Sequence, residues 1–352
     1  LDLNGNTYTF TTAGTTASKV VDVNYDNVCF TIKNGSLQTD NRNADGIQLV
    51  PARGKIAKNR SVVLENVTLT IPGDAYGIVT NGTNENTAVT LKNSTLNVPD
   101  GYGIYFPSDG TLTIENSTIN AKQTGVELRA GTLTVTDSTI TATDNFSETP
   151  NGNGTTMTGV AVAVSQHTTN HAIDVTISGD SVLEGAKALY EKDLQDEAAD
   201  DITMSVTGGK FNGDVYSENC EKFISGGYFT SDPTAYLAEG KVVLPGSYVA
   251  NGVTYGYKVG DPLPEEVEEI REDNPDVTVA PGASTLPEED QTNLTTKIQG
   301  TGLTAPAQDA AAQGEIQDLP AADQKKEVFD NKLPEGATQA TNDEAVITVV
   351  AP

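Results

Sequence analysis

Apolar residues recur at a fixed offset along much of the chain. Eight apolar anchor positions are each followed, five residues later, by a second apolar residue. The anchors are Ile32, Leu64, Leu91, Ile114, Val135, Ile177, Val206 and Ile224, and the second residues are Leu37, Leu69, Leu96, Ile119, Ile140, Val182, Phe211 and Phe229. Two residues after each anchor stands Asn34, Asn66, Asn93, Asn116, Asp137, Gly179, Gly208 or Gly226. Because Asn, Asp and Gly tolerate positive φ, these positions predict a sharp turn between two short strands.

A further strand is predicted in most units by a small or turn-forming residue followed by an apolar one. The pairs are Gly46-Ile47, Gly77-Ile78, Gly103-Ile104, Gly125-Val126, Gly159-Val160, Ala188-Leu189 and Asp214-Val215. Neighbouring anchors are 18 to 42 residues apart, which suits a solenoid whose strands stack while its loops vary in length. The repeat therefore predicts an all-β fold, a parallel β-helix of about eight rungs, in which turn Asn residues form a ladder.

The repeat units resemble those of a known structural class. The segments Leu112–Ile119 and Ile224–Gly240, together with the opening Leu1-Asp-Leu-Asn-Gly5, are similar to rungs of pectin-lyase-like surface proteins of gut-type anaerobic bacteria. The resemblance covers residues 1–258 and implies a right-handed parallel β-helix. It does not select a function, because this superfamily includes polysaccharide lyases, glycoside hydrolases and adhesins.

Charge and composition place a domain boundary near Gly260. The chain carries 21 basic and 49 acidic residues, a formal charge of −28. Residues 261–352 hold 20 of the acidic and 5 of the basic residues, net −15. We therefore expect a β-helix over 1–260 and a small acidic α+β or α-rich domain over 261–352, with partial disorder as the alternative. Helices are expected at 285–300 and 318–329, and a strand at 345–350.

Composition also excludes several classes of partner. The acidity disfavours nucleic acid, which needs a basic surface, and no apolar run reaches the roughly 20 residues of a membrane span. Two cysteines and two histidines leave little for a zinc site, so no metal or cofactor is expected. Cys29 and Cys220 are predicted to lie about seven rungs, or roughly 30 Å, apart. Both are therefore expected to be free thiols.

One short motif suggests catalysis. Asn43-Ala44-Asp45-Gly46 is similar to the Asn-x-Asp-Gly element of polygalacturonase-type hydrolases, in which the Asp takes part in acid–base chemistry. Residues 48–71 lack the Asp pair that would supply a second carboxylate. A turn that opens a strand is the favoured interpretation, and no catalytic residue is assigned.

Two further features have ordinary explanations. The basic segment 53–60, with Arg53, Lys55, Lys58 and Arg60, can contact an acidic polysaccharide, although a solvated loop that offsets neighbouring carboxylates is favoured. His167 and His171 lie between strand-like segments and are expected in a surface loop rather than in a metal site. The insert between Thr143 and Thr158 interrupts the repeat, and such inserted loops often carry binding functions.

The most specific binding hypothesis concerns the residues that follow the small–apolar pairs. If the apolar residue points inward, the next side chain points outward. Stacking then aligns these outward side chains in one column on one face. The column consists of Gln48, Tyr105, Glu127, Tyr190 and Tyr216, with Arg129 nearby, and Val79 and Ala161 interrupt it. Aromatic faces with polar edges suit sugar rings. Strand propensity alone is the alternative explanation for the tyrosines.

These observations predict an extracellular or cell-surface protein that binds a polysaccharide or cell-surface glycan without turnover. A divergent polysaccharide lyase or glycoside hydrolase is the first alternative. A structural stalk is the second. Nothing in the pattern indicates the oligomeric state.

Overall fold

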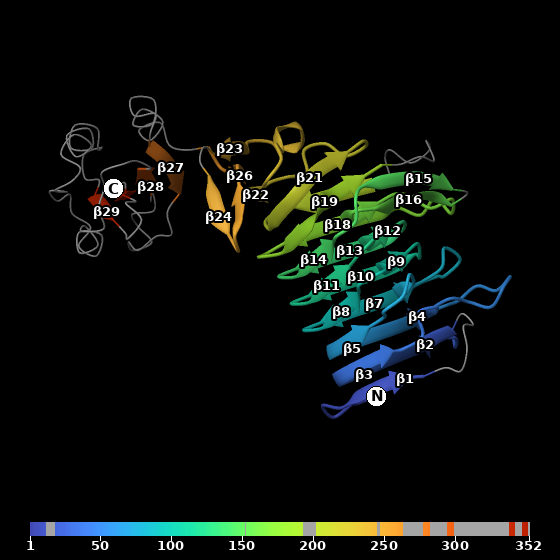
Figure 1. Cartoon of the computed structure of the whole chain (residues 1–352). Helices are drawn as coiled ribbons and strands as arrows, with labels where there is room; N and C mark the ends of the chain where they lie inside the picture. Colours follow the sequence, from blue (N-terminus) through green and yellow to red (C-terminus); the bar gives the residue numbers. More distant parts are fainter. Residues whose placement is uncertain are drawn as a thin grey trace. The chain divides into compact units, whose positions relative to one another are not determined.

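A computed structural model describes residues 1–11, 18–151, 153–192, 202–244, 247–262, 277–281, 294–298, 338–341 and 347–350 of the 352-residue chain. The chain divides into two compact units. One contains residues 1–239 and 249–259, and the other contains residues 240–248 and 260–352. Figure 1 shows the strands of both units.

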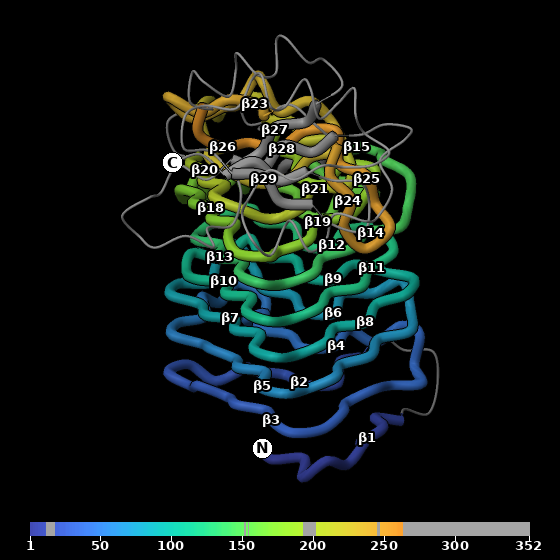
Figure 2. The backbone as a smooth tube through the Cα atoms, turned by 90° about the vertical axis from the view of Figure 1, so that its left-hand side faces the viewer, coloured from blue at the N-terminus to red at the C-terminus, as the bar shows by residue number. Residues whose placement is uncertain are grey.

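The first unit is a parallel β-helix whose coils stack on one another (Figure 2), and its strand pairings form three parallel columns, here called sheets. The first sheet contains the N-terminal parts of β3 (Val28–Thr39) and β5 (Arg60–Thr70), then β7 (Thr87–Lys92), β10 (Gly110–Glu115), β13 (Gly131–Thr136), β18 (Ile173–Ser178) and β20 (Ile202–Val206). The second contains β1 (Thr7–Phe10), the C-terminal parts of β3 and β5, β8 (Thr95–Val98), β11 (Thr118–Ala121), β14 (Thr139–Ala142), the beginnings of β19 (Val182–Glu191) and β21 (Lys210–Ser217), and β22 (Gly227–Phe229).

The third sheet positions the candidate site. It contains β2 (Ser18–Asp22), β4 (Ala44–Gln48), β6 (Tyr76–Val79), β9 (Tyr102–Phe106), β12 (Thr124–Leu128), β17 (Val160–Val164) and the ends of β19 and β21. An antiparallel hairpin of β15 (Ser147–Asn151) and β16 (Gly154–Thr158) is inserted before β17. This hairpin is the insert that interrupts the sequence repeat.

The remaining elements are short. β26 (Tyr257–Gly260) pairs antiparallel with β22, and β24 (Tyr248–Ala250) pairs with β25 (Val253–Tyr255). The 3-10 helix η1 spans Thr234–Tyr236, and β23 spans Val242–Leu244. In the second unit, β27 (Val277–Pro281) pairs with β28 (Leu294–Ile298), and β29 (Thr338–Thr341) pairs with β30 (Ile347–Val350), both antiparallel.

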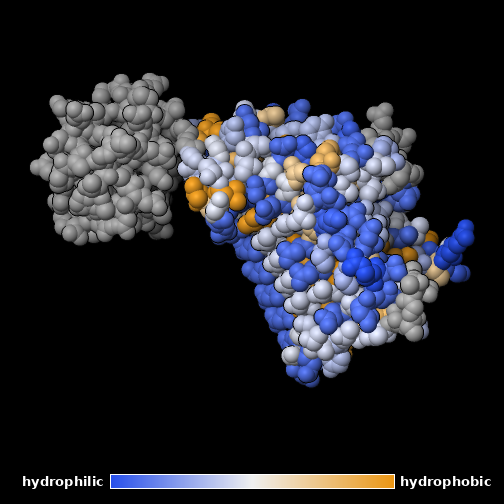
Figure 3. Space-filling view, in the orientation of Figure 1, coloured by the Kyte–Doolittle hydropathy of each residue, from blue (hydrophilic) through white to orange (hydrophobic). Residues whose placement is uncertain are grey.

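The eight anchors form one continuous inward column, as predicted. Each anchor pairs in register with the next, from Ile32 with Leu64 through to Val206 with Ile224. All eight side chains are buried. Stacking them removes a continuous apolar strip from water, which a single rung could not do alone. Hydrophilic residues cover most of the β-helix face seen in Figure 3.

The second column follows the prediction except at one rung. Leu37, Leu69, Leu96, Ile119 and Ile140 pair in sequence, but Ile140 then pairs with Leu183, not with the predicted Val182. The turn after Ile177 contains one additional residue, so Ser181 rather than Asp180 occupies the position of Ser138. The column then continues to Phe211 and Phe229, whose rings stack at a centroid distance of 4.7 Å.

The predicted turn positions have positive φ at six of the eight rungs. Those residues are Asn34, Asn66, Asn93, Asn116, Asp137 and Gly179. The prediction is wrong for Gly208 and Gly226, because the following glycines, Gly209 and Gly227, take the positive φ instead. Only a residue without a Cβ enters that region at no steric cost, and both rungs have paired glycines from which either can serve.

Polar side chains of the turns form hydrogen bonds from rung to rung. The buried hydroxyl of Ser117 accepts the backbone N–H of Ser94, and that of Ser138 accepts the N–H of Ser117, each at 3.0 Å. The side-chain amide of Asn66 donates to Asn34 at 3.2 Å, as expected for an Asn ladder. The two serine bonds satisfy backbone N–H groups that the turns would otherwise leave buried without a partner.

Small residues at the start of the third-sheet strands are required by the close stacking. A Cβ at Gly103 would lie 2.2 Å from the carbonyl oxygen of Gly125 and 2.7 Å from Ile119. The predicted pair Gly159-Val160 is displaced by two residues, because Val126 pairs with Val162 and the small residue in that rung is Ala161. A turn at Gly159, with φ of 70°, joins the inserted hairpin to the strand and shifts the register.

Of the three elements predicted for the C-terminal segment, one is confirmed, one is wrong and one lies outside the described residues. The strand predicted at 345–350 is confirmed by β30. The helix predicted at 285–300 is wrong at 294–298, where β28 pairs with β27. Threonine-rich Leu294–Ile298 has strand propensity, which here outweighs the capping-box pattern upstream. The helix expected at 318–329 lies outside the described residues. The domain boundary at 260 stays a prediction.

Candidate functional site

The predicted outward column is aligned in register on the third sheet. Consecutive rungs pair Gln48 with Val79, Val79 with Tyr105 and Tyr105 with Glu127. The column then continues through Ala163, Tyr190 and Tyr216. Ala163, rather than Ala161, therefore interrupts the aromatic side chains, as the displaced register of β17 requires.

The middle of this column is covered rather than open. Glu127 and Arg129 have only 3% and 1% of their surface exposed, and Tyr190 has 7%. Gln48 and Tyr105 are half-buried, whereas Tyr216 is 36% exposed. The predicted alignment on one face is confirmed, but Glu127, Arg129 and Tyr190 are buried on that face and do not contribute an open surface. The cause is the β15–β16 hairpin, which contacts this part of the third sheet.

Arg129 joins the hairpin to the column. Its Nη1 donates to the carbonyl oxygen of Asn153 at 2.7 Å, and its Nη2 donates to that of Thr155. Nε and Nη2 also donate to Oε1 of Glu127, at 3.0 and 2.6 Å. The guanidinium carbon lies 5.2 Å from the centre of the Tyr105 ring, within the range of a cation–π contact. One buried cation thus organises a carboxylate, an aromatic ring and the inserted hairpin.

Burial controls the protonation of these groups. Burial raises the pKa of Glu127 above its usual value, and the neighbouring Arg129 opposes that rise. Burial also raises the pKa of Tyr105, again opposed by Arg129. Tyr76 has a pKa raised mainly by burial and additionally by the negative charge of Glu127. The tyrosines therefore remain protonated hydroxyl donors at neutral pH.

Two tyrosines that were not predicted complete this site. Tyr76 pairs with Tyr102 on adjacent rungs, with ring centroids 5.1 Å apart and rings inclined by 27°. The Tyr76 ring also lies 5.6 Å from that of Tyr105. The repeated Tyr-Gly-Ile at 76–78 and 102–104 was a usable sequence signal. It was missed because only the residue after each small–apolar pair was considered, not the residue before it.

A cavity of about 460 Å³ opens beside this tyrosine cluster. Its walls combine aromatic, aliphatic and polar side chains, namely Val50, Tyr76, Val79, Thr80, Asn81, Tyr105, Arg129, Asn153 and Thr156. Thr80 is buried, and its hydroxyl has no hydrogen-bond partner among the described residues. Leaving a buried hydroxyl without a partner is unfavourable, so the Thr80 hydroxyl lowers the stability of the fold.

A second aromatic group lies beyond the hairpin, at the other end of the column. The rings of Tyr190 and Tyr216 stack with centroids 5.0 Å apart, and Phe146 lies 5.0 Å from Tyr190. The Tyr190 hydroxyl donates to Glu148 at 2.8 Å, and Lys192 forms an ion pair with the same carboxylate at 2.9 Å. These contacts hold the hairpin against the third sheet, and Tyr190 is buried because it packs and bonds there.

Asp45, the residue of the catalysis-like motif, supports the local backbone. Its Oδ1 accepts the backbone N–H of Tyr76 at 3.0 Å, and its Oδ2 accepts the side-chain amide of Gln48. A carboxylate that accepts a backbone N–H at a strand opening matches the turn interpretation. It also positions Tyr76, the first residue of β6, within the tyrosine cluster.

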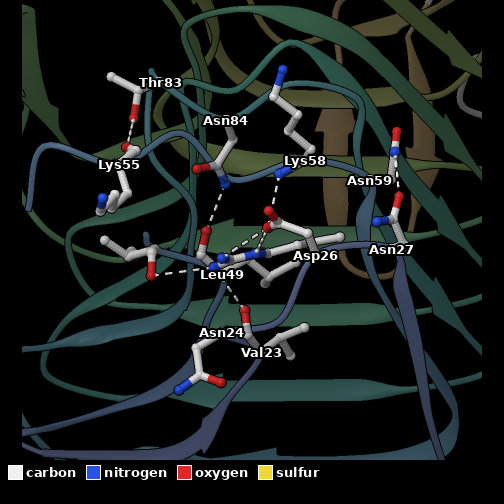
Figure 4. Close-up of polar contacts among 12 residues, drawn as sticks. Val23, Asn24, Asp26, Asn27, Leu49, Lys55, Lys58, Asn59, Thr83 and Asn84 are labelled. Carbon is white, nitrogen blue, oxygen red and sulfur yellow. Dashed lines mark hydrogen bonds and ion pairs between the residues drawn. The ribbon is translucent and has the colours of Figure 1, made fainter. Parts of the chain in front are cut away.

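The basic segment 53–60 is largely engaged in structural contacts. Arg60 is buried and donates to Oδ1 of Asp26 at 3.0 Å and to the carbonyl oxygen of Val23 at 3.1 Å. The backbone N–H of Lys58 donates to the same Asp26 oxygen (Figure 4), and the Lys58 ammonium pairs with Glu85 at 2.9 Å. Arg53 and Lys55 are exposed. The pairs with Asp26 and Glu85 agree with a loop that offsets neighbouring carboxylates, although Arg60 itself is buried.

The remaining candidate groups have distinct environments. His167 lies in the loop between β17 and β18, but it is buried rather than on the surface, with Nδ1 accepting the backbone N–H of Thr169 at 3.2 Å. Burial lowers the pKa of His167. Cys29 and Cys220 are free thiols, as predicted. Among the described residues, no group of three or more His, Cys, Asp or Glu side chains is placed to hold a metal ion.

The comparisons with known proteins concern the same region. Within the described part of the chain, the structure contains no helix with the length and apolarity of a membrane span. No curated protein and no solved structure matches the chain. A family model described as a right-handed β-helix region matches residues 76–187, from β6 into β19. Over these residues, which include the tyrosine cluster and the inserted hairpin, the chain is similar to right-handed β-helix proteins, in agreement with the predicted fold class.

Proposed function

We propose that this protein is an extracellular or cell-surface glycan-binding protein that acts without turnover. The observation that carries the proposal is the cavity of about 460 Å³ beside Tyr76 and Tyr105. Sugars are recognised by aromatic faces that pack against C–H groups, together with polar atoms that bond hydroxyls. This cavity offers both kinds of group.

The repeating geometry favours an oligosaccharide over a single sugar. Tyr76 and Tyr102 occupy equivalent positions on adjacent rungs, and adjacent strands lie about 4.8 Å apart. That spacing approximates the length of one sugar unit, so a glycan lying along the helix axis meets similar groups at successive rungs. Tyr216, beyond the hairpin, offers a second and more exposed ring.

The absence of turnover is part of the same proposal. Asp45 bonds to Tyr76 and Gln48, and Glu127 is bonded to Arg129, so both carboxylates have structural partners. General acid–base hydrolysis needs a pair of carboxyl groups placed on either side of the scissile bond. The similarity of residues 76–187 to right-handed β-helix proteins is compatible with a carbohydrate-related role in either case.

The test is a glycan array combined with two turnover assays. Fluorescently labelled protein is applied to the array, and unlabelled protein is incubated with the glycans that bind. Released reducing ends report hydrolysis, and unsaturated uronide absorbance reports lyase action. Binding without turnover is the expected result. Turnover would instead establish a lyase or hydrolase, and the lack of both would leave the stalk.

A further inference from the structure

Arg129 is the one charged residue among the nine described residues that line the cavity. An isolated arginine in such a place would favour an anionic ligand, because its guanidinium binds carboxylates in a two-pronged geometry. The charge state of the Arg129 environment therefore decides which class of glycan the cavity accepts.

Four of the five N–H donors of Arg129 are already used inside the protein. Nε and Nη2 bond to Glu127, and Nη1 and Nη2 bond to the hairpin carbonyls of Asn153 and Thr155. The side chain is 1% exposed. No two-pronged face remains for a ligand carboxylate, because the edge formed by Nε and Nη2 already holds Glu127 and the edge formed by Nη1 and Nη2 bonds the two hairpin carbonyls.

The Glu127 carboxylate also cancels the charge of Arg129. Its Oε1 lies 2.6 Å from Nη2, and both side chains are buried, where charges interact more strongly than in water. A uronate, sialate or sulfate entering the cavity would meet a neutralised pair on residues 1–260, whose formal charge is −13, the difference between −28 for the chain and −15 for residues 261–352. The net negative charge of the protein repels such an anion, whereas a neutral sugar carries no charge and is not repelled.

We infer that the cavity selects neutral glycans, and that Glu127 determines this specificity by neutralising Arg129 and occupying its two-pronged face. The inference rests on the proposed glycan binding and adds the ligand class. Glu127 also holds Arg129 in position, so it acts on the ligand through the arginine.

The first test compares neutral and anionic glycans on the same array, including β-1,4-glucan and β-1,4-mannan hexasaccharides and their C6-oxidised uronate counterparts. Neutral glycans are expected to bind at least about tenfold more tightly than their uronate partners. Binding of neutral glycans is also expected to change less than about twofold between 50 and 500 mM NaCl, because no ligand charge is screened.

The second test uses Glu127→Gln, which retains a hydrogen-bond acceptor but removes the negative charge. The variant is expected to lose about tenfold of its preference for neutral over uronate hexasaccharides. Glu115→Gln is the matched control, because Glu115 also faces a cation, Lys92 at 3.8 Å, but lies on the first sheet. The control is expected to keep the wild-type preference.

The outcomes separate the two proposals. Binding confined to anionic glycans would overturn neutral selectivity while leaving glycan binding intact, and no binding to any glycan would overturn both. If Glu127→Gln does not fold, the wild-type preference and its salt dependence still decide the question. An unchanged preference in a folded Glu127→Gln would overturn the role of Glu127.

Discussion

Glu127 and Arg129 stand two positions apart at the end of β12, and the carboxylate of Glu127 accepts hydrogen bonds from both Nε and Nη2 of Arg129, at 3.0 and 2.6 Å. The same guanidinium holds two carbonyl groups of the β15–β16 hairpin. The pair therefore links the regular β-helix to the one insert that covers its third sheet. Removing either partner leaves the other charge buried and uncompensated.

Arg129→Met is expected to destabilise the protein by about 3–5 kcal/mol, because it leaves Glu127 and two hairpin carbonyls without their partner. Urea unfolding measures the loss, and faster cleavage within residues 147–158 by a protease detects release of the hairpin. Arg42→Met is the matched control, since Arg42 pairs with Asp100 at the surface and should cost about 0–1 kcal/mol. Equal losses for the two variants would contradict the linking role.

Gly103→Ala is expected to cost about 3 kcal/mol or more, because its Cβ would lie 2.2 Å from the carbonyl oxygen of Gly125. The backbone of a stacked rung cannot move without breaking ladder bonds on both sides. Gly256→Ala, where nothing lies within 4 Å of the added Cβ, should change the free energy of unfolding by less than about 0.5 kcal/mol. Comparable urea midpoints for both variants would disprove the proposed stacking constraint.

The two inward apolar columns of the β-helix could be predicted because they follow from a fixed offset of five residues within each rung. Each anchor and the residue five positions later lie on opposite sides of one turn. Their offset therefore does not depend on the length of the loops elsewhere in the rung. The pattern fails where an extra residue enters the turn, as at Asp180, which moves the inward position from Val182 to Leu183. The separate pattern of small–apolar pairs fails at Val160, because the hairpin returns to the sheet through Gly159 and displaces the register by two residues.

The candidate site was predictable only in part, for a different reason. Alternation along a strand places Gln48, Tyr105 and Glu127 on one side of the sheet, and the structure confirms their alignment. Alternation contains no information about what covers that side. The burial of Arg129 depends on carbonyl groups of a hairpin more than twenty residues away in sequence, a tertiary contact that no local pattern describes.

Acid is expected to weaken the contact between Asp26 and the basic segment. The pKa of Asp26 is lowered mainly by the hydrogen bond from the Lys58 backbone N–H and also by Arg60. Ionised Asp26 therefore stabilises the fold above the unfolded-state pKa near 4, and this contribution is lost as the pH falls through the lower folded-state pKa. Asp26→Asn should be less stable than the wild type at pH 7, with a difference that shrinks at pH 3. Urea unfolding at both pH values measures it, and a difference that persists at pH 3 would contradict the assignment.

Thr80→Val is expected to leave stability unchanged or raise it slightly, because it removes a buried hydroxyl that has no partner among the described residues. If that hydroxyl serves a ligand in the cavity, the same variant should bind glycan more weakly, by about fivefold to tenfold for one neutral hydrogen bond. Thermal unfolding measures the stability, and calorimetric titration with a glycan that binds on the array measures the affinity. A loss of stability with full affinity would reverse both expectations.

The most direct measurement of the central claim is isothermal titration calorimetry with the neutral glycan that binds most strongly on the array. Tyr105→Ala is expected to weaken binding at least about tenfold, because it removes an aromatic wall of the cavity. Tyr25→Ala, which removes a tyrosine that is 75% exposed and does not line the cavity, is expected to bind like the wild type. Equal affinity in all three proteins, with the Tyr105→Ala variant folded, would contradict glycan binding at this site.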